Sequence, residues 1–533
     1  MAAVKTNGTW RILDDRGKVI RDSGSGLREA RAKFVQKRQE KLSSSAYRGA
    51  ESGRAWGTWG SIDHSAQGAF HNRRRFLVNR SQDLIRNDPI AHGMLRTYES
   101  EVIGTGIRVQ ADVNAEQLGL SEVEAEELNA DIDRRWKQWI RWADYEERTN
   151  FYDIQALTFR QWRGSGETIV LPRWVERDGA PLDFCLQVLD QDRVRQPYGH
   201  PESTTLRDGV ELGPRGEEVA VHVLRHHPGD RTIGSMGMES DRIPRRGRDG
   251  EPVYWRHYDV LRPGQLRGEP FLSSCLNYFA HLDQYLEAEW WAKQLEALFG
   301  VFIKSDDPVG QAEGALNSDL TSRYNQPIDE IGVGTVNYLG EGEDVVSVSS
   351  NRPGSGSVDF VNMALRFIGA SQGWPIELVL KDFSRSNFSN VRAALIGARR
   401  LFRQDQLKLI AHVIEPARRE VIRELWLRDV FPRRLTRDPR NFEALAQAQY
   451  LPPGWQWVDP QKDATAAETK LTNHLDTFQN LYAERGEDWR VQLYQRAKEE
   501  RLRTELGLAP AAAGGGAGDD PDEVEEDERR NRE

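Results

Sequence analysis

One long helical pattern constrains the fold of this chain more than any other feature. Apolar residues recur at helical spacing from Phe271 to about Phe299. At about 1.5 Å per residue, such a helix spans roughly 40 Å. Residues 301–352 then become strand-like and rich in Gly and Asp, and the segment SGSVDFVNMALRFIGASQG predicts a shorter helix. The predicted arrangement is therefore helix, small insert, helix.

The stretch ahead of this helix predicts a mixed lobe of helices and strands. Residues 121–143 indicate a helix opened by Ser121, with acidic residues in its first turn. Residues 150–265 alternate a helix-like segment with strand-like segments, separated by Gly, Pro and Asp turns. In the first helix, three tryptophans recur every three residues and favour a core stripe over a ligand platform: Trp136, Trp139 and Trp142.

Helical patterns also flank this lobe. The segment RRRFLVNRSQDLIRNDPIAHGMLRTYESEVIG predicts two helices broken at Pro89, and VIGTGIRVQ then alternates like a strand. A strong helical pattern begins at Asn390, with Ser389 as its N-cap and Pro416 as the expected kink. A final helical region is predicted over residues 463–506.

Charge is concentrated at one end of the sequence. Residues 519–533 hold nine acidic and three basic residues, which contribute −6 of the net charge of −10. The remaining −4 is spread over more than 500 residues, which excludes a strongly basic protein that coats DNA by neutralising phosphates. We expect residues 1–60 to form a flexible arm, and residues beyond Leu508 to be disordered.

Composition also argues against several classes of protein. No apolar run approaches the roughly 18 residues of a membrane span, and no signal-peptide core is present. We therefore expect a soluble protein made in the cytoplasm, without membrane contact. Cys185 and Cys275 belong to no metal-binding or disulfide pattern, and the adjacent His226 and His227 are poor joint ligands on a strand. No metal and no cofactor are predicted.

One apparent catalytic motif stands at Gly369-Ala370-Ser371-Gln372-Gly373, which matches G-x-S-x-G. A nucleophile elbow needs a strand before the serine and a helix after it. Here the preceding residues look helical, and Trp374 and Pro375 follow. A serine hydrolase using Ser371 is therefore the weaker alternative. No G-x-x-x-x-G-K-[ST] loop is present, so an ATP-driven motor must be a separate partner.

Four segments in order resemble the portal proteins of lambda-type tailed phages. They are RSQDLIRNDPIAHGMLRTYESEVIGTGIRVQ, LRPGQLRGEPFLSSCLNYFAHLDQYLEAEWWAKQLEA, GWPIELVLKDFSRSNFSNVRAALIGARRLF and LPPGWQWVDPQKDATAAETKLTNHLDTFQNLYAERGEDW. The third, residues 373–402, is the most specific. The resemblance implies a portal fold, predominantly α-helical within the α+β class, with wing, stem, clip and crown regions.

On this resemblance the chain divides into nine parts. They are an arm at 1–60, a wing at 61–268, a first stem helix at 269–300, a clip at 301–353, a second stem helix at 354–377, a tunnel loop at 378–389, a long channel and wing helix at 390–445, a helical crown region at 446–508 and an acidic tail at 509–533.

The resemblance also implies a function without catalysis. Copies of the chain, commonly twelve, would form a ring at one capsid vertex of the virion, the channel through which the phage genome is packaged and ejected. The implied partners are the terminase large subunit as packaging motor, the major capsid protein and scaffold, a head-completion or adaptor protein, and double-stranded DNA, held non-specifically and transiently. A monomeric DNA-binding adaptor is the other alternative.

The tunnel loop would face the DNA. Its polar residues are Lys381, Asp382, Ser384, Arg385, Ser386 and Asn387. A channel through which DNA must slide should not hold phosphates tightly, so a few alternating charges suit it better than a dense basic patch. Without the resemblance, the same residues indicate an ordinary solvated loop. For the arginines of the following helix, packing between subunits is favoured over DNA binding: Arg392, Arg399, Arg400 and Arg403.

Overall fold

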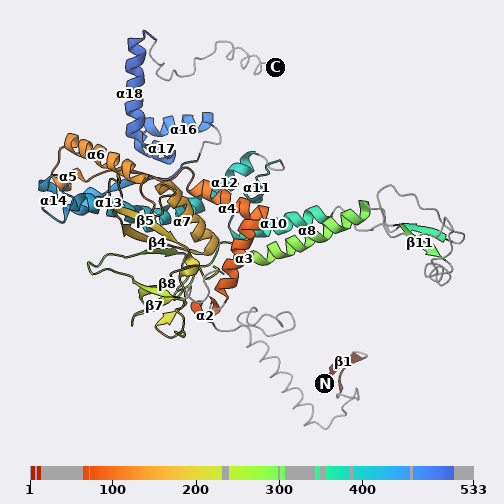
Figure 1. The fold of residues 1–533 in the computed structure, drawn as a ribbon. Helices are drawn as coiled ribbons and strands as arrows, with labels where there is room; N and C mark the ends of the chain where they lie inside the picture. The colour runs from red at the N-terminus through yellow and green to blue at the C-terminus, as the bar shows by residue number, and fades with distance from the viewer. Residues whose placement is uncertain are drawn as a thin grey trace, which may run out of the picture. The chain divides into compact units, whose positions relative to one another are not determined.

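The computed structural model describes two units separately. In residues 1–65, the strands β1 (Ala2–Thr6) and β2 (Thr9–Leu13) pair antiparallel as a hairpin. The expected arm lies mostly outside the described residues, and the hairpin within it was not predicted. In residues 66–533, the structure describes 66–70, 73–230, 239–297, 301–305, 343–347, 356–384, 388–455 and 460–508 (Figure 1).

The helices of the predicted wing begin where local capping signals place them. The break at Pro89 is confirmed: α3 (Arg74–Asn87) ends before it, and α4 (Pro89–Val102) begins there. Asp88 caps α4, because its Oδ1 accepts the backbone N–H groups of Ile90 and Ala91 at 2.8 and 2.7 Å. The other helices here are α2 (Ala66–Phe70), α5 (Ala115–Leu118), α6 (Glu122–Ile140) and α7 (Phe151–Ser165).

Ser121 caps α6 as expected, in a reciprocal capping box with Glu124. Trp136 and Trp139 lie in the main core, which confirms the tryptophan stripe for these two residues. Trp139 stacks on Phe184 at 5.4 Å between ring centres and donates its Nε1–H to the Phe184 carbonyl oxygen at 2.8 Å. Trp142 follows the helix end and remains half-buried.

Antiparallel sheets complete this lobe. Strand β4 (Glu167–Trp174) lies between β10 (Trp255–Tyr258) and β5 (Phe184–Leu189). A second sheet has the order β6-β7-β8-β9, formed by Leu206–Arg207, Val210–Leu212, Glu218–Leu224 and Ser240–Pro244. A short helix, η3 (Gln191–Arg193), follows β5. Together these elements confirm a predominantly helical α+β fold.

Strand β3 (Arg108–Ala111) is shorter than the alternating pattern VIGTGIRVQ predicts. The segment before it turns at Gly104 and Gly106, whose φ angles are 53° and 108°. The partner of β3 is β13 (Ala448–Leu451), more than 300 residues later in the chain. Such a pairing cannot be read from local sequence.

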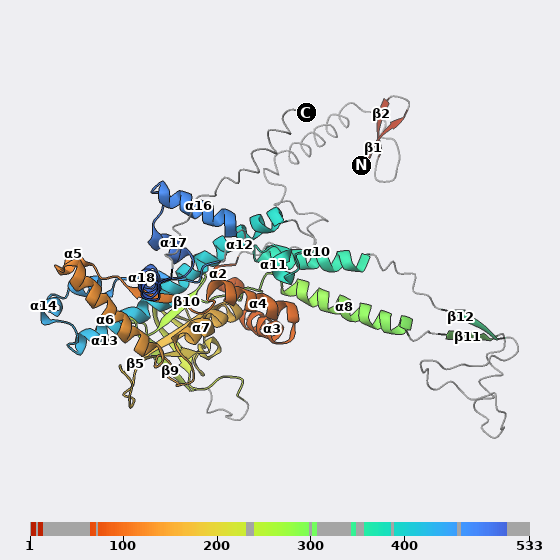
Figure 2. The ribbon, with the colours of Figure 1, turned by 90° about the horizontal axis from the view of Figure 1, so that it is seen from above.

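The two long predicted helices lie side by side as α8 (Leu276–Ala297) and α10 (Gly356–Ser371) (Figure 2). Helix α8 begins five residues later than expected, because the backbone from Phe271 to Cys275 forms turns and Phe271 N–H donates to the Arg163 carbonyl oxygen at 2.9 Å. Strands β11 (Val301–Ser305) and β12 (Glu343–Ser347) pair within the insert. The rest of the insert lies outside the described residues.

The predicted helix from Asn390 is longer and more complex than expected. Helix α12 (Phe388–Leu409) continues through the π-helical turn η5 (Ile410–Ile414) into α13 (Glu415–Leu427). Ser389 therefore lies inside α12 and is not its N-cap. The π-helical turn ends at Ile414, two residues before Pro416. Because the helix is continuous there, the proline removes one backbone donor and crowds the preceding turn, which explains why the irregularity lies at this point.

The predicted helical region at 463–506 is found as three helices, and two shorter helices precede it. The elements are α14 (Arg433–Thr436), α15 (Asn441–Ala446), α16 (Pro460–Thr472), α17 (Phe478–Glu484) and α18 (Trp489–Glu505). Asp488 caps α18 through its Oδ1. Neither α17 nor α18 has a buried residue. Among the described helices, none is long and apolar enough to cross a membrane.

Candidate functional site

The base of the α8–α10 pair is held to the α+β lobe, the predicted wing, by a buried cluster of charges around Glu167. This carboxylate is fully buried on β4 and pairs with Arg267, with Arg74 at 3.1 Å and with Arg256 at 3.4 Å. Burial alone would raise the pKa of Glu167, but the three guanidinium groups outweigh it and lower the pKa to about 2. Glu167 therefore remains ionised and links the α3 helix, two strands and the turn before α8.

Arg267 belongs to the same cluster and lies in the turn before α8. Its guanidinium has no exposed surface and also donates to the carbonyl oxygens of Val194 and Asp208 at 3.0 and 2.6 Å. A buried charge is tolerated only when its donors are satisfied. The turn at Arg267 and Gly268 is thus an anchor that fixes where the helical pair leaves this lobe.

A second polar cluster joins α4, α7 and α12. Arg163 pairs with Asp405, and its Nη1 donates to Asp259 Oδ2 at 2.8 Å. Asp405 also accepts the hydroxyl of Tyr98, and Lys408 Nζ lies 2.6 Å from Asp259 Oδ1. Burial raises the pKa of Asp405, whereas for Asp259 the positive charges of Arg163 and Lys408 outweigh burial and lower the pKa. The cluster holds α12 against the wing.

Two histidines stack where the π-helical turn interrupts the long helix. The rings of His257 on β10 and His412 on η5 lie 4.2 Å apart at an angle of 19°. Trp162 contacts the other side of His257 at 4.4 Å between ring centres. Burial, followed by the neighbouring His412, lowers the pKa of His257 to about 3. Both rings are therefore neutral near pH 7.

The apolar side chains of the α8–α10 pair are buried at one end of the pair and exposed at the other. Near the wing, Phe279 and Ile368 are fully buried in the main core. Farther along, Tyr285 packs on Phe360 with ring centres 4.5 Å apart. Beyond this contact, Trp290 and Trp291 are 65% and 58% exposed. Other large apolar side chains exposed on the pair are Leu286, Val358, Met363 and Phe367.

The G-x-S-x-G motif is the end of helix α10. Ser371 is its last residue, and Ser371 Oγ donates to the Ile368 carbonyl oxygen at 2.7 Å. Gly373 has a φ of 67°, which reverses the chain, and Trp374 N–H donates to the Gly369 carbonyl oxygen at 2.8 Å. A helix instead of a strand precedes the serine. The motif therefore caps a helix, and the geometry of a nucleophile elbow is absent at this serine.

The predicted tunnel loop is only partly described. Residues 378–380 belong to α11 (Ile376–Leu380), where Leu378 and Val379 are buried. Lys381 ends α11 with a φ of 55° and is exposed. Asp382 and Ser384 are exposed too, and Ser384 N–H donates to Asp382 Oδ1 at 3.0 Å. The exposed connection to α12 thus begins at Lys381. The other predicted site residues lie outside the described residues: Arg385, Ser386 and Asn387.

The arginines of α12 have different surroundings. Arg399 lies over the ring of Trp455 at 5.6 Å, and Arg403 Nη1 donates to Gln406 Oε1 at 3.3 Å. Arg400 is exposed on the same helix. Asp405, on the same helix, pairs with Arg163 and lies 3.6 Å from Lys408.

One group of possible metal ligands occurs in the described part of the chain. It consists of Asp190, Asp192 and His227, whose potential ligand atoms lie within 4.8 Å of one another. His227 Nδ1 accepts a hydrogen bond from Gly229 N–H at 3.0 Å, so Nε2 carries the proton in a neutral ring. Nε2 lies 3.8 Å from Asp190 Oδ2 and 3.8 Å from Asp192 Oδ2, so these three side chains form a loose charged cluster beyond hydrogen-bond distance.

Sequence reasoning missed the residues of both buried polar clusters. Glu167 stands in the strand-like segment ETIVLPRWVE and Asp405 in a polar stretch of a helix, and neither position is unusual locally. Apart from Lys408, their partners lie 89 to 307 residues away in the chain. The one sequence signal that could have pointed to these clusters is a charged residue at a position predicted to be buried.

Comparison with known proteins points to one family. The family described as phage portal protein, lambda family, matches residues 52–406. The chain is 24% identical over 437 residues to a protein of Halomonas phage phiHAP-1 named "Probable portal protein", covering 80% of each chain. It is 22% identical to the portal protein of Escherichia phage N15 and 21% identical to portal protein B of Escherichia phage lambda. Both matches cover 81% of this chain and 85% of the relative.

Solved structures were also compared. The neck of a native gene transfer agent particle, computed with C12 symmetry, contains a chain with 14% identity and a TM-score of 0.37, covering 83% of this chain and 95% of that chain. A chain from the virion of a native gene transfer agent particle has 14% identity and a TM-score of 0.38, covering 82% and 94%.

Proposed function

This chain belongs to the lambda family of phage portal proteins, and we propose that its copies close into a ring whose channel carries the phage genome during packaging and ejection. The work of such a subunit is mechanical, and Ser371 serves to end a helix. The ring would stand at the portal vertex of the virion after synthesis in the host cytoplasm, and the family resemblance favours twelve copies.

The exposed apolar surface of the α8–α10 pair carries this proposal. Trp290 and Trp291 are more than half exposed in the single chain, and large apolar patches on a soluble protein mark interaction surfaces. A second copy of the chain is the occupant that fits a portal subunit. An interface in which different faces of neighbouring copies meet closes into a ring when the rotation is right.

The DNA-facing part of the channel would be the connection from α11 to α12. Lys381, Asp382 and Ser384 are exposed there, and the sequence continues with Arg385, Ser386 and Asn387. One carboxylate stands between two cations, so each copy offers little net positive charge. Repeated around a ring, such a segment contacts phosphates transiently and leaves the DNA free to slide.

The proposed partners follow from the same family membership. The terminase large subunit would supply the motor, which accords with the lack of an ATP-binding loop in the sequence. A head-completion or adaptor protein would bind the clip at residues 301–353, and the major capsid protein with its scaffold would surround the wing. The proposed wing at 61–268 and crown at 446–508 keep the boundaries inferred from the sequence.

Electron microscopy and sedimentation of the purified chain test the ring directly. We expect annular particles whose mass is a multiple of 60.8 kDa. The double variant Trp290→Lys/Trp291→Lys should remain monomeric, because lysine at both positions opposes apolar packing. The control Trp174→Lys changes another tryptophan, 56% exposed on β4, and should still form rings. A wild-type chain that stays monomeric at high concentration would contradict the proposal.

A further inference from the structure

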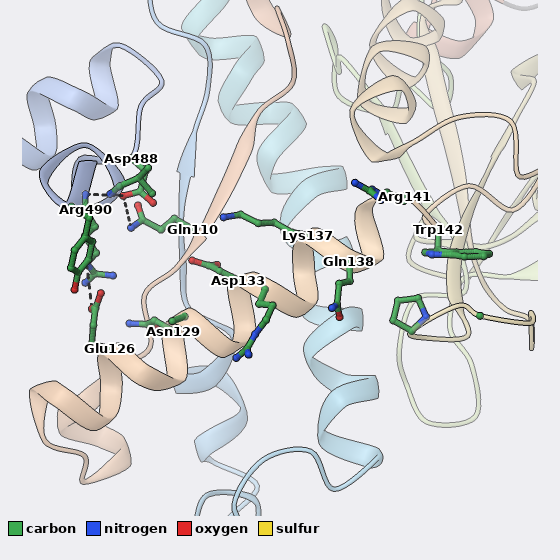
Figure 3. Close-up of a pocket in the computed structure, with 16 residues that line it drawn as sticks. Gln110, Glu126, Asn129, Asp133, Lys137, Gln138, Arg141, Trp142, Asp488 and Arg490 are labelled. Carbon is green, nitrogen blue, oxygen red and sulfur yellow. Dashed lines mark hydrogen bonds and ion pairs between the residues drawn. The ribbon is translucent and has the colours of Figure 1, made fainter. Parts of the chain in front are cut away.

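A groove runs along the outer face of α6, where the start of α18 crosses it (Figure 3). Its volume is about 910 Å³, and it is open to solvent along its length. Near the crossing, Asp488 Oδ1 accepts a hydrogen bond from Gln110 Nε2 at 3.0 Å. Arg490 Nε lies 3.5 Å from Glu126 Oε2. The charges at this end of the groove are therefore compensated.

The other end of the groove carries uncompensated positive charge. Lys137 lies on α6 and Arg141 directly follows its last residue; both are exposed, and neither makes an ion pair with any residue in the described ranges. The nearby Asp133 carboxylate is within electrostatic reach of Lys137, and its Oδ1 accepts a hydrogen bond from the backbone N–H of Ala111 at 2.8 Å. Arg134 also lines the groove and pairs with Asp131 at 2.6 Å. Two free cations thus face solvent in a concave surface.

The chain contains one strongly complementary segment. Residues 519–533 carry nine acidic and three basic residues, a net charge of −6. They follow α18 through residues 509–518, which are mainly Ala and Gly. Opposite charges of this size attract across several ångströms at low salt. The first part of α18 lines the groove, and the acidic segment follows the other end of this helix through the Ala/Gly-rich connection.

The connecting chain is long enough to return to the groove. Helix α18 has 17 residues, so its far end lies about 24 Å from its start. From Leu508 to Asp519 the chain can extend by roughly 36 Å. The distance along α6 from Glu126 to Arg141 is about 22 Å. The acidic residues can therefore reach the basic end of the groove on the same chain.

We propose that the acidic segment 519–533 docks onto Lys137 and Arg141 in the α6 groove of its own chain. The contact is electrostatic, so it weakens with salt and yields to a stronger anionic competitor. Docking covers basic charge that would otherwise attract nucleic acid to the outer surface of the subunit. The inference does not depend on ring assembly or on the proposed channel segment.

Carbodiimide crosslinking of the full chain tests this docking, because the reagent joins a lysine amine to a carboxylate that touches it. In about 50 mM NaCl, peptides containing Lys137 should be joined to peptides from 519–533, and the yield should fall several-fold in about 500 mM NaCl. Lys498 is exposed on α18 and nearer in sequence. A yield at Lys498 that equals or exceeds the yield at Lys137 would indicate a freely moving segment and overturn the proposal.

A matched pair of variants tests the role of the groove. Arg141→Glu leaves the Lys137 amine in place but removes one cation and adds an anion, and should lower the Lys137 crosslink several-fold. Arg86→Glu makes the same charge change at an exposed position on α3 and should leave the crosslink unchanged. An equal yield in both variants would overturn the proposal.

The mass of the product on a denaturing gel shows which chain supplies the groove. We expect crosslinked product at the mass of one chain. Product at the mass of two chains would place the segment in a neighbour's groove and overturn docking within one chain. Arg141→Glu could lower the crosslink by destabilising the chain, which a lower unfolding midpoint would reveal. In that case the salt dependence of the Lys137 crosslink in the wild-type chain tests the docking.

Discussion

Gly268 approaches Gly166 so closely that a Cβ atom at Gly268 would lie 1.9 Å from the Gly166 carbonyl oxygen. Gly166 has a φ of 94°, and a Cβ atom there would lie 2.5 Å from the backbone carbon of Glu269. Arg74 Nε also donates to the Gly268 carbonyl oxygen at 3.0 Å. The end of α7 and the turn before α8 therefore touch backbone to backbone, directly beside the Glu167 cluster.

Gly268→Ala should destabilise the subunit strongly, because its methyl group meets backbone atoms that cannot rotate away. We expect a loss of at least about 1–3 kcal/mol in the free energy of unfolding, measured by urea denaturation. The control Gly397→Ala adds a methyl group in open space on α12 and should stabilise by up to about 1 kcal/mol. Equal effects of the two changes would contradict the close approach.

Glu167→Gln should be among the most damaging single changes, because it removes the carboxylate that three buried guanidinium groups share. Within the described ranges, Arg256 keeps only Glu218 and Arg267 keeps only Asp208 as an ion-pair partner. We expect a loss of about 3–5 kcal/mol, whereas Glu127→Gln, at an exposed position on α6, should change stability by less than about 0.5 kcal/mol. Because the folded pKa of Glu167 is lowered to about 2, its contribution is full above the unfolded pKa of about 4.3 and is lost as pH falls towards 2.

The stacked pair of His257 and His412 predicts acid sensitivity. Their pKa values are lowered in the fold, so the unfolded chain binds more protons below about pH 6.5. Stability should be full above that pH and should fall as pH drops towards 3, by up to about 1.4 kcal/mol per pH unit from His257. The exposed His412 should contribute less, because solvent screens its charge.

In His257→Phe, the free energy of unfolding should fall less between about pH 7 and about pH 5 than it does in the wild type. Urea unfolding at fixed protein concentration measures this difference. His281→Phe replaces an exposed histidine on α8 and should leave the pH dependence as in the wild type. If His257→Phe keeps the wild-type slope, the stacked pair does not cause the acid sensitivity.

Charge reversal in the proposed channel segment separates a portal from a DNA-binding adaptor. Lys381→Glu/Arg385→Glu should form rings as the wild type does but reduce genome packaging several-fold, because the channel wall becomes repulsive to phosphates. Arg433→Glu/Arg437→Glu makes the same change in charge on α14, at two exposed positions, and should package normally. If the variant neither forms rings nor binds DNA, the result would favour a DNA-binding adaptor.

Ser371→Ala should be nearly silent in function, because the Ser371 hydroxyl bonds to its own helix. We expect a stability loss of about 1 kcal/mol, the usual worth of one hydrogen bond. A fluorophosphonate probe should label neither the wild type nor the variant. Labelling that depends on Ser371 would instead support a hydrolase.

Local sequence patterns predicted many helix boundaries, since their causes lie within a few residues. Asp88 before Pro89, and Ser121 with Glu124, are caps that act over one turn. The same reasoning was wrong at Ser389, which lies inside α12, and at the start of α8, where Phe271 bonds to α7 instead of continuing a helix. There a contact between distant segments overrides the local preference.

The sequence by itself determined the alternation of lobe, long helix, insert and helix, and the order of motifs that identified the family. Apolar spacing and capping are local properties, so they can be read without a structure. Only the tertiary structure decided which charges meet. Glu167 with Arg267, and Asp405 with Tyr98, are separated by 100 and 307 residues. The free energy of these contacts depends on burial and on the distance between the groups, and neither quantity exists before the chain folds.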